Sequence, residues 1–120
     1  MPYLPRRKPR PAHQGRRYKD NRYNGRQWRN ARAAYLKQHP LCCICNRAAA
    51  VIDHAVPVRI DPTMFYVVDN WQPMCHSCHN RKSATIDKQI QQAPPDVITY
   101  KARVQQQLLE WLEGEGGCYK

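Results

Sequence analysis

The sequence predicts a small α+β domain in which a β-hairpin and a helix are held together by a bound metal. Its 120 residues are enough for one domain. A domain of this size, with ten prolines, buries a modest apolar core and often depends on a metal or on disulfides. Two short cysteine pairs, about thirty residues apart, supply ligands for such a metal. The apolar segments between the pairs are short and partly β-branched, which indicates strands, and helical patterns flank them.

A lead-in helix is predicted before the first cysteine pair. Residues 27–38 follow a helical period, with Trp28 and Leu36 on one face, until the helix should end before Pro40. We interpret the face of Trp28 and Leu36 as core. The opposite face carries Arg29, whose charge suits a phosphate.

The remaining elements follow in order. Residues 49–56 and 65–68 are apolar and partly β-branched, which predicts two antiparallel strands. A helix is expected over residues 77–91, ending before a Pro-Pro pair. The last helix is expected over residues 97–113, with Asp96 as its N-cap.

The two cysteine pairs predict a structural zinc. Two residues between thiols allow one backbone turn to aim both sulfurs at a single ion, and four thiolates suit tetrahedral zinc. The predicted ligands are Cys42, Cys45, Cys75 and Cys78. An iron–sulfur centre or a redox dithiol is the alternative for these pairs, and Cys43 or His76 is an alternative ligand. Zinc would supply folding free energy on the order of 10 kcal/mol, which would offset the small core.

The positive charge is concentrated at the start of the chain. Residues 1–32 hold eleven of the 20 Lys and Arg residues and one of the nine acidic residues. A polyanion, with DNA or RNA leading, is the natural partner, because aromatic rings interleaved with the arginines can stack on bases. A solvated tail is the alternative. We expect a flexible basic arm at residues 1–25, a folded domain at 26–113 and a tail at 114–120.

Membrane insertion is not expected from this sequence. No apolar run approaches the ~20 residues that span a bilayer, and no hydrophobic segment follows the basic N-terminus, as a signal peptide requires. We therefore expect a soluble protein of the cytoplasm without a membrane partner. Thiols stay reduced there, which favours metal ligation over disulfides.

Asp53, His54 and His79 are candidates for a second metal site. Neighbouring helical residues point about 100° apart, so if Cys78 faces the zinc, His79 can face the strand that carries Asp53. Neighbouring strand residues point to opposite faces, so Asp53 and His54 need a bend to reach one site, which Pro57 favours. Taken singly, each candidate has a structural interpretation: an ion-pair aspartate, a core histidine and a helix-surface histidine.

The order of these motifs resembles the HNH endonuclease family. Asp53-His54, then Asn70, then CHSCHNRK closing on His79, together with the paired CxxC motifs, carry the resemblance, which covers about residues 28–83. The stretches WRNARAAYLKQHPLC and NWQPMC are most similar to small phage-encoded members. The resemblance implies a ββα-metal (His-Me finger) core with flanking helices. It also implies metal-dependent hydrolysis of phosphodiester bonds in DNA.

The resemblance assigns roles to individual residues. Asp53 and His79 would bind the catalytic divalent ion, and His54 would be the general base that takes a proton from the attacking water. Asn70 would hydrogen-bond across the loop and hold His54 in place. The ion would stabilise the leaving 3′ oxygen. Family members often carry a further ligand at the position of Ser83, a poor ligand, so we expect loose, exchangeable metal binding.

Cofactors and partners follow from the same resemblance. We expect magnesium or manganese at the catalytic site, with zinc or nickel as alternatives, beside the structural zinc. Arg29, Arg81 and Lys82 would contact DNA phosphates, a solvated face being the alternative. Resemblance to phage proteins implies action in the host-cell cytoplasm, beside the terminase and other packaging proteins. A restriction or mobile-element role is the other biology considered.

Two rivals from other functional classes keep the zinc and the arm but not the catalysis. The first is a non-catalytic, zinc-stabilised nucleic-acid-binding module, which has no use for His54. The second is a structural zinc protein that binds RNA or a protein partner. Plasmid cleavage in the presence of a divalent metal separates the nuclease from both.

Overall fold

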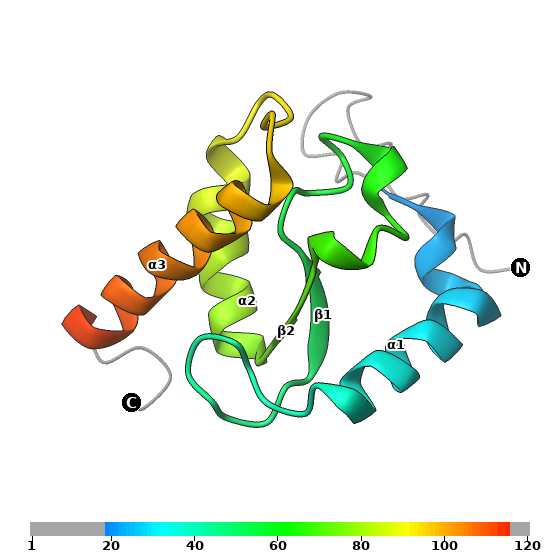
Figure 1. The fold of residues 1–120 in the computed structure, drawn as a ribbon, viewed down its shortest axis with the longest axis horizontal. Coiled ribbons are helices and arrows are strands. Elements are labelled where there is room, and N and C mark those ends of the chain that lie inside the picture. The colour runs from blue at the N-terminus through cyan, green and yellow to red at the C-terminus, as the bar shows by residue number, and fades with distance from the viewer. Residues whose placement is uncertain (1–18, 116–120) are drawn as a thin grey trace, which may run out of the picture.

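A computed structural model describes residues 19–115 of this chain, and Figure 1 shows a central β-hairpin enclosed by helices. The main elements in order are α1 (Arg26–Gln38), β1 (Val51–His54), β2 (Trp71–Met74), α2 (His76–Lys82), the π-helical segment η4 (Ser83–Asp87) and α3 (Val97–Glu115). Short 3-10 helices lie at η1 (Asn21–Asn24), η2 (Pro62–Met64) and η3 (Val68–Asn70). The structure is therefore a small α+β fold.

Helices flank the hairpin on two sides. In Figure 1, α1 lies on one side of the hairpin and α2 on the other, and α3 packs against α2 on its far side. The predicted N-cap of α3 is present, because Asp96 accepts hydrogen bonds from Ile98 N at 3.0 Å and from Thr99 Oγ1 at 2.6 Å. The predicted helices over residues 27–38 and 97–113 are thus confirmed, with ends that differ by one or two residues.

The second strand is the main correction to the predicted elements. Residues 65–68, predicted as a strand, instead lie in and between two 3-10 helices, with Phe65 fully buried in the core. The strand lies at residues 71–74 and includes Pro73, which sits opposite Ile52. A two-stranded sheet tolerates this proline because its outer edge needs no ladder hydrogen bond.

The alternation of side chains along β1 divides them between two cores. Val51 packs against the buried cysteines and α3, whereas Ile52 joins an aromatic core with Trp28, Phe65 and Trp71. Asp53 shares the face of Val51 and pairs in register with Gln72. The sheet therefore presents Asp53 toward α2 and the next residue, His54, toward α1.

The predicted arm and tail fall mostly outside the described residues. Residues 1–18 and 116–120 lie beyond them. Residues 21–24, assigned to the arm from sequence, form the 3-10 helix η1, because Asp20 caps it by accepting from Arg22 N at 3.0 Å. Arg22 also donates to Pro62 O at 3.0 Å, which fixes this turn to the hairpin loop. The division into arm, domain and tail remains a prediction.

No helix in residues 19–115 combines the length and the apolar character that a membrane span requires.

Candidate active site and metal centres

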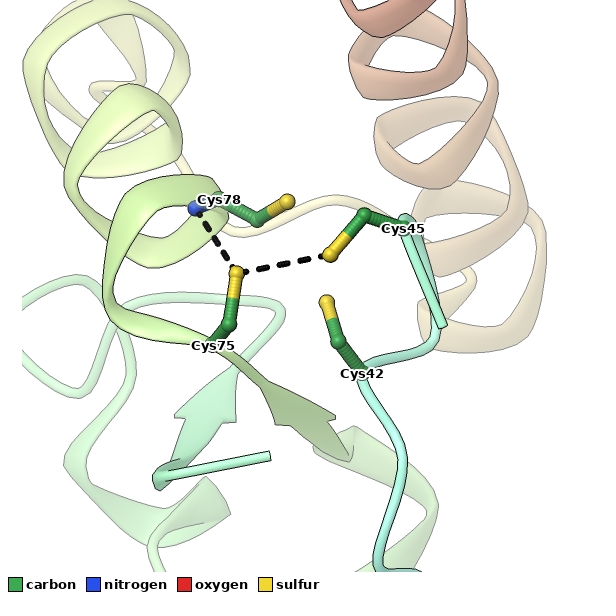
Figure 2. A group of neighbouring side chains, drawn as sticks. All are labelled: Cys42, Cys45, Cys75 and Cys78. Carbon is green, nitrogen blue, oxygen red and sulfur yellow. Dashed lines mark hydrogen bonds between the residues drawn. The ribbon is translucent and has the colours of Figure 1, made fainter. Parts of the chain in front are cut away.

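The four predicted cysteines converge on one point beside the hairpin. Cys42 and Cys45 come from the loop after α1, Cys75 directly follows β2 as the N-cap of α2, and Cys78 lies in the first turn of α2. Figure 2 shows their sulfurs pointing toward one another, and all four lie within 4.8 Å of each other. All four residues are buried. Asn46, which follows the second cysteine of this loop, takes the left-handed conformation, with φ of 62°.

The chemistry of this set fits zinc. Sulfurs around a tetrahedral zinc lie roughly 3.8 Å apart, because each zinc–sulfur bond is about 2.3 Å long. Cys45 Sγ and Cys75 Sγ are 3.5 Å apart, and backbone N–H groups of Ile44 and Cys78 approach Cys42 Sγ and Cys75 Sγ at 3.4 Å. Burial beside other thiols raises the pKa of Cys45 to about 12. A dication would be needed to hold it as a thiolate.

The alternative ligands lie away from this cluster. Cys43 is half-buried, and its sulfur contacts Gln72 Oε1 at 3.8 Å instead. His76 is exposed at the start of α2. The ligand set predicted from the two CxxC spacings is thus the one that the fold brings together.

The two carboxylate oxygens of Asp53 have different partners. Oδ2 accepts from Gln72 Nε2 at 2.7 Å and lies 3.1 Å from Lys82 Nζ. Oδ1 faces His79, whose Nε2 lies 3.6 Å away. Oδ1 is therefore the oxygen that a metal beside His79 would share.

The Asp53–His79 pair fits a divalent cation. A metal about 2.1 Å from each ligand atom, at right angles, places an oxygen and a nitrogen roughly 3 Å apart. The observed 3.6 Å needs only a small side-chain adjustment. Among residues 19–115, the side chains that converge as a group of three or more potential metal ligands are the four cysteines. Asp53 and His79 form a pair without a third such ligand in this part of the chain. The pair would thus leave positions for water and phosphate.

His54 has both ring nitrogens engaged and lies within the aromatic core. Nε2 lies 2.9 Å from Phe65 O, and Nδ1 lies 3.0 Å from the Tyr23 hydroxyl. The imidazole stacks on Trp28, with ring centroids 5.4 Å apart. Burial lowers the pKa of His54 and also that of His79, so both imidazoles are neutral near pH 7. A neutral imidazole can accept a proton or bind a metal.

Asn70 spans the loop that follows β1. Its side-chain oxygen accepts from Val56 N at 2.8 Å, and its Nδ2 donates to Val56 O at 3.0 Å. Its backbone oxygen accepts from Ala55 N at 2.8 Å. Asn70 is fully buried. The three bonds fix Ala55 and Val56, the two residues after His54. Asn70 therefore forms hydrogen bonds across the loop, as the sequence predicted.

Asp53 and His54 point to opposite faces yet line one cavity. This cavity of about 630 Å³ is lined by residues of η1, α1, β1 and α2, including Tyr23, Trp28, Asp53, His54 and His79. Because β1 pairs only with β2 in the described sheet, its outer edge is unpaired, and the cavity follows that edge. The expected bend is therefore not what joins the two side chains. The open strand edge gives access to both faces.

Lys82 corrects one of the predicted phosphate contacts. The sequence assigned it to a DNA phosphate, but its side chain is fully buried. Its Nζ lies 3.1 Å from Asp53 Oδ2, donates to His54 O at 3.2 Å and bonds the Asp87 carboxylate. Burial alone would lower the pKa of Lys82, but the two carboxylates outweigh it and raise the pKa. Lys82 is thus an internal cation that anchors Asp53.

The other predicted phosphate contacts lie on accessible parts of the described surface. Arg29 is exposed on α1. Arg81 is half-buried, with its guanidinium 5.4 Å from the Trp111 ring centroid. Arg32 and Arg59 also line the cavity, a position that the sequence did not predict for them. No local signal pointed to Arg59, which is brought there by bonds to the backbone oxygens of Asp87 and Ile90.

Tyr23, Gln72 and Asp87 are further site residues that sequence reasoning missed. Tyr23 lies within the stretch that the sequence assigned to the basic arm, and its place beside His54 depends on the tertiary fold. A signal was available for Lys82, because it lies three residues after His79 and so shares its helix face.

Comparison with known proteins finds a relative among solved structures. No family model matches the sequence, and no curated protein does. Among solved structures, the chain is similar to the HNH endonuclease of the deep-sea thermophilic bacteriophage GVE2, crystallised with a manganese ion. The sequences are 33% identical, the match covers 57% of this chain and 82% of that chain, and the TM-score is 0.52. The chain belongs to the HNH endonuclease family.

Proposed function

We propose that this protein is a metal-dependent DNA endonuclease that hydrolyses phosphodiester bonds. The observation that carries the proposal is the cavity in which a buried carboxylate, Asp53, and two imidazoles, His54 and His79, come together. A carboxylate–imidazole pair beside a separate neutral imidazole suits a metal centre next to a general base. The manganese-bound structure of the phage relative supports the same interpretation.

His54 is the proposed general base, and its hydrogen bonds decide which nitrogen acts. A carbonyl oxygen can only accept, so Nε2 carries the proton that is donated to Phe65 O. Nδ1 is then the basic nitrogen, on the side of the ring that Tyr23 shares. Asn70 acts indirectly, because its bonds to Val56 and Ala55 fix the loop that follows His54.

Asp53 Oδ1 and His79 Nε2 are the proposed protein ligands of the catalytic ion, for which we favour magnesium or manganese. When bound, the ion supplies positive charge for the leaving 3′ oxygen. Gln72 and Lys82 hold Asp53 by its other oxygen, so Oδ1 stays directed at His79. The four cysteines would hold a structural zinc that fixes the start of α2, which completes a ββα-metal core.

Positive charge around the cavity supports a nucleic-acid substrate. Arg32 and Arg59 line the cavity, and exposed Arg29 lies one helical turn from Arg32 on α1. We propose that these guanidinium groups, with Arg81, contact backbone phosphates and give affinity that is largely independent of DNA sequence. The basic residues before residue 19 would add to this affinity.

The biological setting is proposed from the relative. Its phage origin supports a phage protein that acts on DNA in the host cytoplasm, and packaging beside a terminase is one such role. A non-catalytic DNA-binding module remains the second candidate, since the zinc centre and the basic surface would serve it equally well.

Cleavage of supercoiled plasmid tests the proposal. Wild type and His54→Gln, which keeps a side chain of similar reach, are incubated with Mg²⁺ or Mn²⁺ after their melting temperatures have been compared. General bases contribute roughly 10²–10⁴-fold to a rate, so His54→Gln should lose at least about a hundredfold of the nicking activity. Equal nicking by both proteins would reject the assigned base. If neither protein nicks but both bind DNA, the binding module is favoured.

A further inference from the structure

We propose that Tyr23 is a further catalytic residue, whose hydroxyl passes the proton of the attacking water to Nδ1 of His54. This inference rests on the proposed nuclease function. It concerns a residue on η1, a turn that the sequence assigned to the arm rather than to the site. The phenol oxygen lies 3.0 Å from Nδ1.

Both ring nitrogens of His54 are hydrogen-bonded, and the partner of the basic nitrogen is the Tyr23 hydroxyl. Nε2 is engaged by Phe65 O at 2.9 Å, which makes Nδ1 the acceptor. A neutral phenol that meets an acceptor nitrogen donates its proton, so the Tyr23 O–H points at Nδ1. A water can therefore reach Nδ1 only through the Tyr23 oxygen, or after that side chain has left.

Burial favours transfer through the phenol. His54 is 5% exposed, whereas Tyr23 is 40% exposed and lines the same cavity as Asp53 and His79. A water in the cavity thus meets the Tyr23 side chain before it meets the imidazole.

The ring of Tyr23 is held in this position. It makes edge contacts with Phe65 and Trp28, at centroid distances of 4.8 and 5.6 Å. The turn that carries it is fixed from both sides, by the Asp20 cap and by the bond from Arg22 to Pro62 O. A phenol fixed in this way is a better relay than a gate, because a gate needs the ring to swing away.

The proposed step is balanced as follows. The water oxygen forms a bond to phosphorus while one of its protons moves to the Tyr23 oxygen and the phenol proton moves to Nδ1. The bond from phosphorus to the leaving oxygen breaks, and its electron pair stays with that oxygen, which takes a proton from solvent. His54 ends as imidazolium and Tyr23 is regenerated as a neutral phenol.

The test compares single-turnover plasmid cleavage by wild type, Tyr23→Phe and Tyr66→Phe, at saturating DNA and Mn²⁺. Tyr66 is the matched control, since its ring packs against the same Phe65 and Trp28 but does not line the cavity. Tyr23→Phe should lose about tenfold or more of the cleavage rate without a change in DNA affinity or melting temperature. Tyr66→Phe should keep the wild-type rate.

A proton inventory in mixtures of H₂O and D₂O reports the relay itself. Wild type should give a curved plot, with two protons in flight, and Tyr23→Phe a linear one. A Tyr23→Phe variant that cleaves as fast as wild type would overturn the relay and make the hydroxyl a mere cover for the base. ¹⁵N NMR of His54 tests the same geometry without catalysis, and a proton found on Nδ1 would overturn the relay alone. A wild type that cleaves no DNA would remove the proposed function and the relay together.

Discussion

The two groups of candidate metal ligands share the first turn of α2 but differ in how closed they are. Cys78 points into a cluster of four buried sulfurs, whereas the next residue, His79, has a side chain that is 35% exposed and faces a single carboxylate. Closed four-sulfur sites are structural, and sites with open positions are catalytic. One short helix can therefore serve both purposes, because neighbouring helical residues point in different directions.

The difference also appears in what surrounds each group. The cysteines are enclosed by apolar side chains of α3, chiefly Val104 and Leu108. Asp53 is instead tied to polar partners, Gln72 and Lys82, and opens on a cavity. We expect removal of the first group to unfold the domain, and changes at the second to alter its chemistry more than its fold.

The largest effect should come from Cys75→Ser. Loss of one thiolate would remove most of the stabilisation by zinc, which is on the order of 10 kcal/mol. The variant should fail to fold or melt at a far lower temperature, and should lose its stoichiometric zinc by elemental analysis. Cys43→Ser is the control and should change stability by about 1 kcal/mol or less, because its sulfur lies outside the cluster. An unchanged melting curve for Cys75→Ser would refute the structural centre.

A smaller loss of stability is expected from Lys82→Met. This change leaves the buried carboxylate of Asp53 and the half-buried carboxylate of Asp87 without their shared cation. Breaking a buried pair by removing one partner costs about 3–5 kcal/mol, which chemical denaturation would measure. Lys88→Met, an exposed site on the same helical segment, should cost less than about 0.5 kcal/mol. Equal stability of both variants would show that Lys82 does not anchor Asp53.

The smallest effect is a shift in titration. Burial lowers the pKa of His54, so NMR of protein free of the exchangeable metal should give a midpoint below the ordinary 6.5. A folded pKa below the unfolded one means that this contribution to stability is complete above pH 6.5. This stability is lost as the pH falls from 6.5 through the lower pKa that His54 has in the folded protein. A midpoint above 6.5 for His54 would contradict a buried, neutral base.

Locally encoded features could be predicted from the sequence. The two CxxC spacings correctly predicted which cysteines converge. The helical periodicity around Trp28 predicted both ends of α1 to within one residue. Asp96 gave the start of α3, because an N-cap depends on residues within one turn. These signals lie within a few residues of one another, so the tertiary fold does not override them.

Features that depend on tertiary contacts could not be predicted. The segment around Phe65 has strand-like composition, but burial of that ring in the aromatic core places it in a loop. Lys82 looks like a surface cation until the fold brings Asp53 and Asp87 to it. Tyr23 reaches His54 from thirty-one positions earlier in the chain. The types of residue in the candidate site could thus be predicted from the sequence. The side chains that hydrogen-bond to them or pair with their charges could not.

Calorimetric titration of Mn²⁺ into zinc-loaded wild type and His79→Ala tests the contrast between the two centres most directly. We expect one exchangeable Mn²⁺ per wild-type chain and binding that is weaker by about tenfold or more in His79→Ala. The zinc content and the melting temperature should be the same in both proteins. Unchanged Mn²⁺ affinity in the variant, or loss of zinc together with it, would contradict two separate centres on one helix.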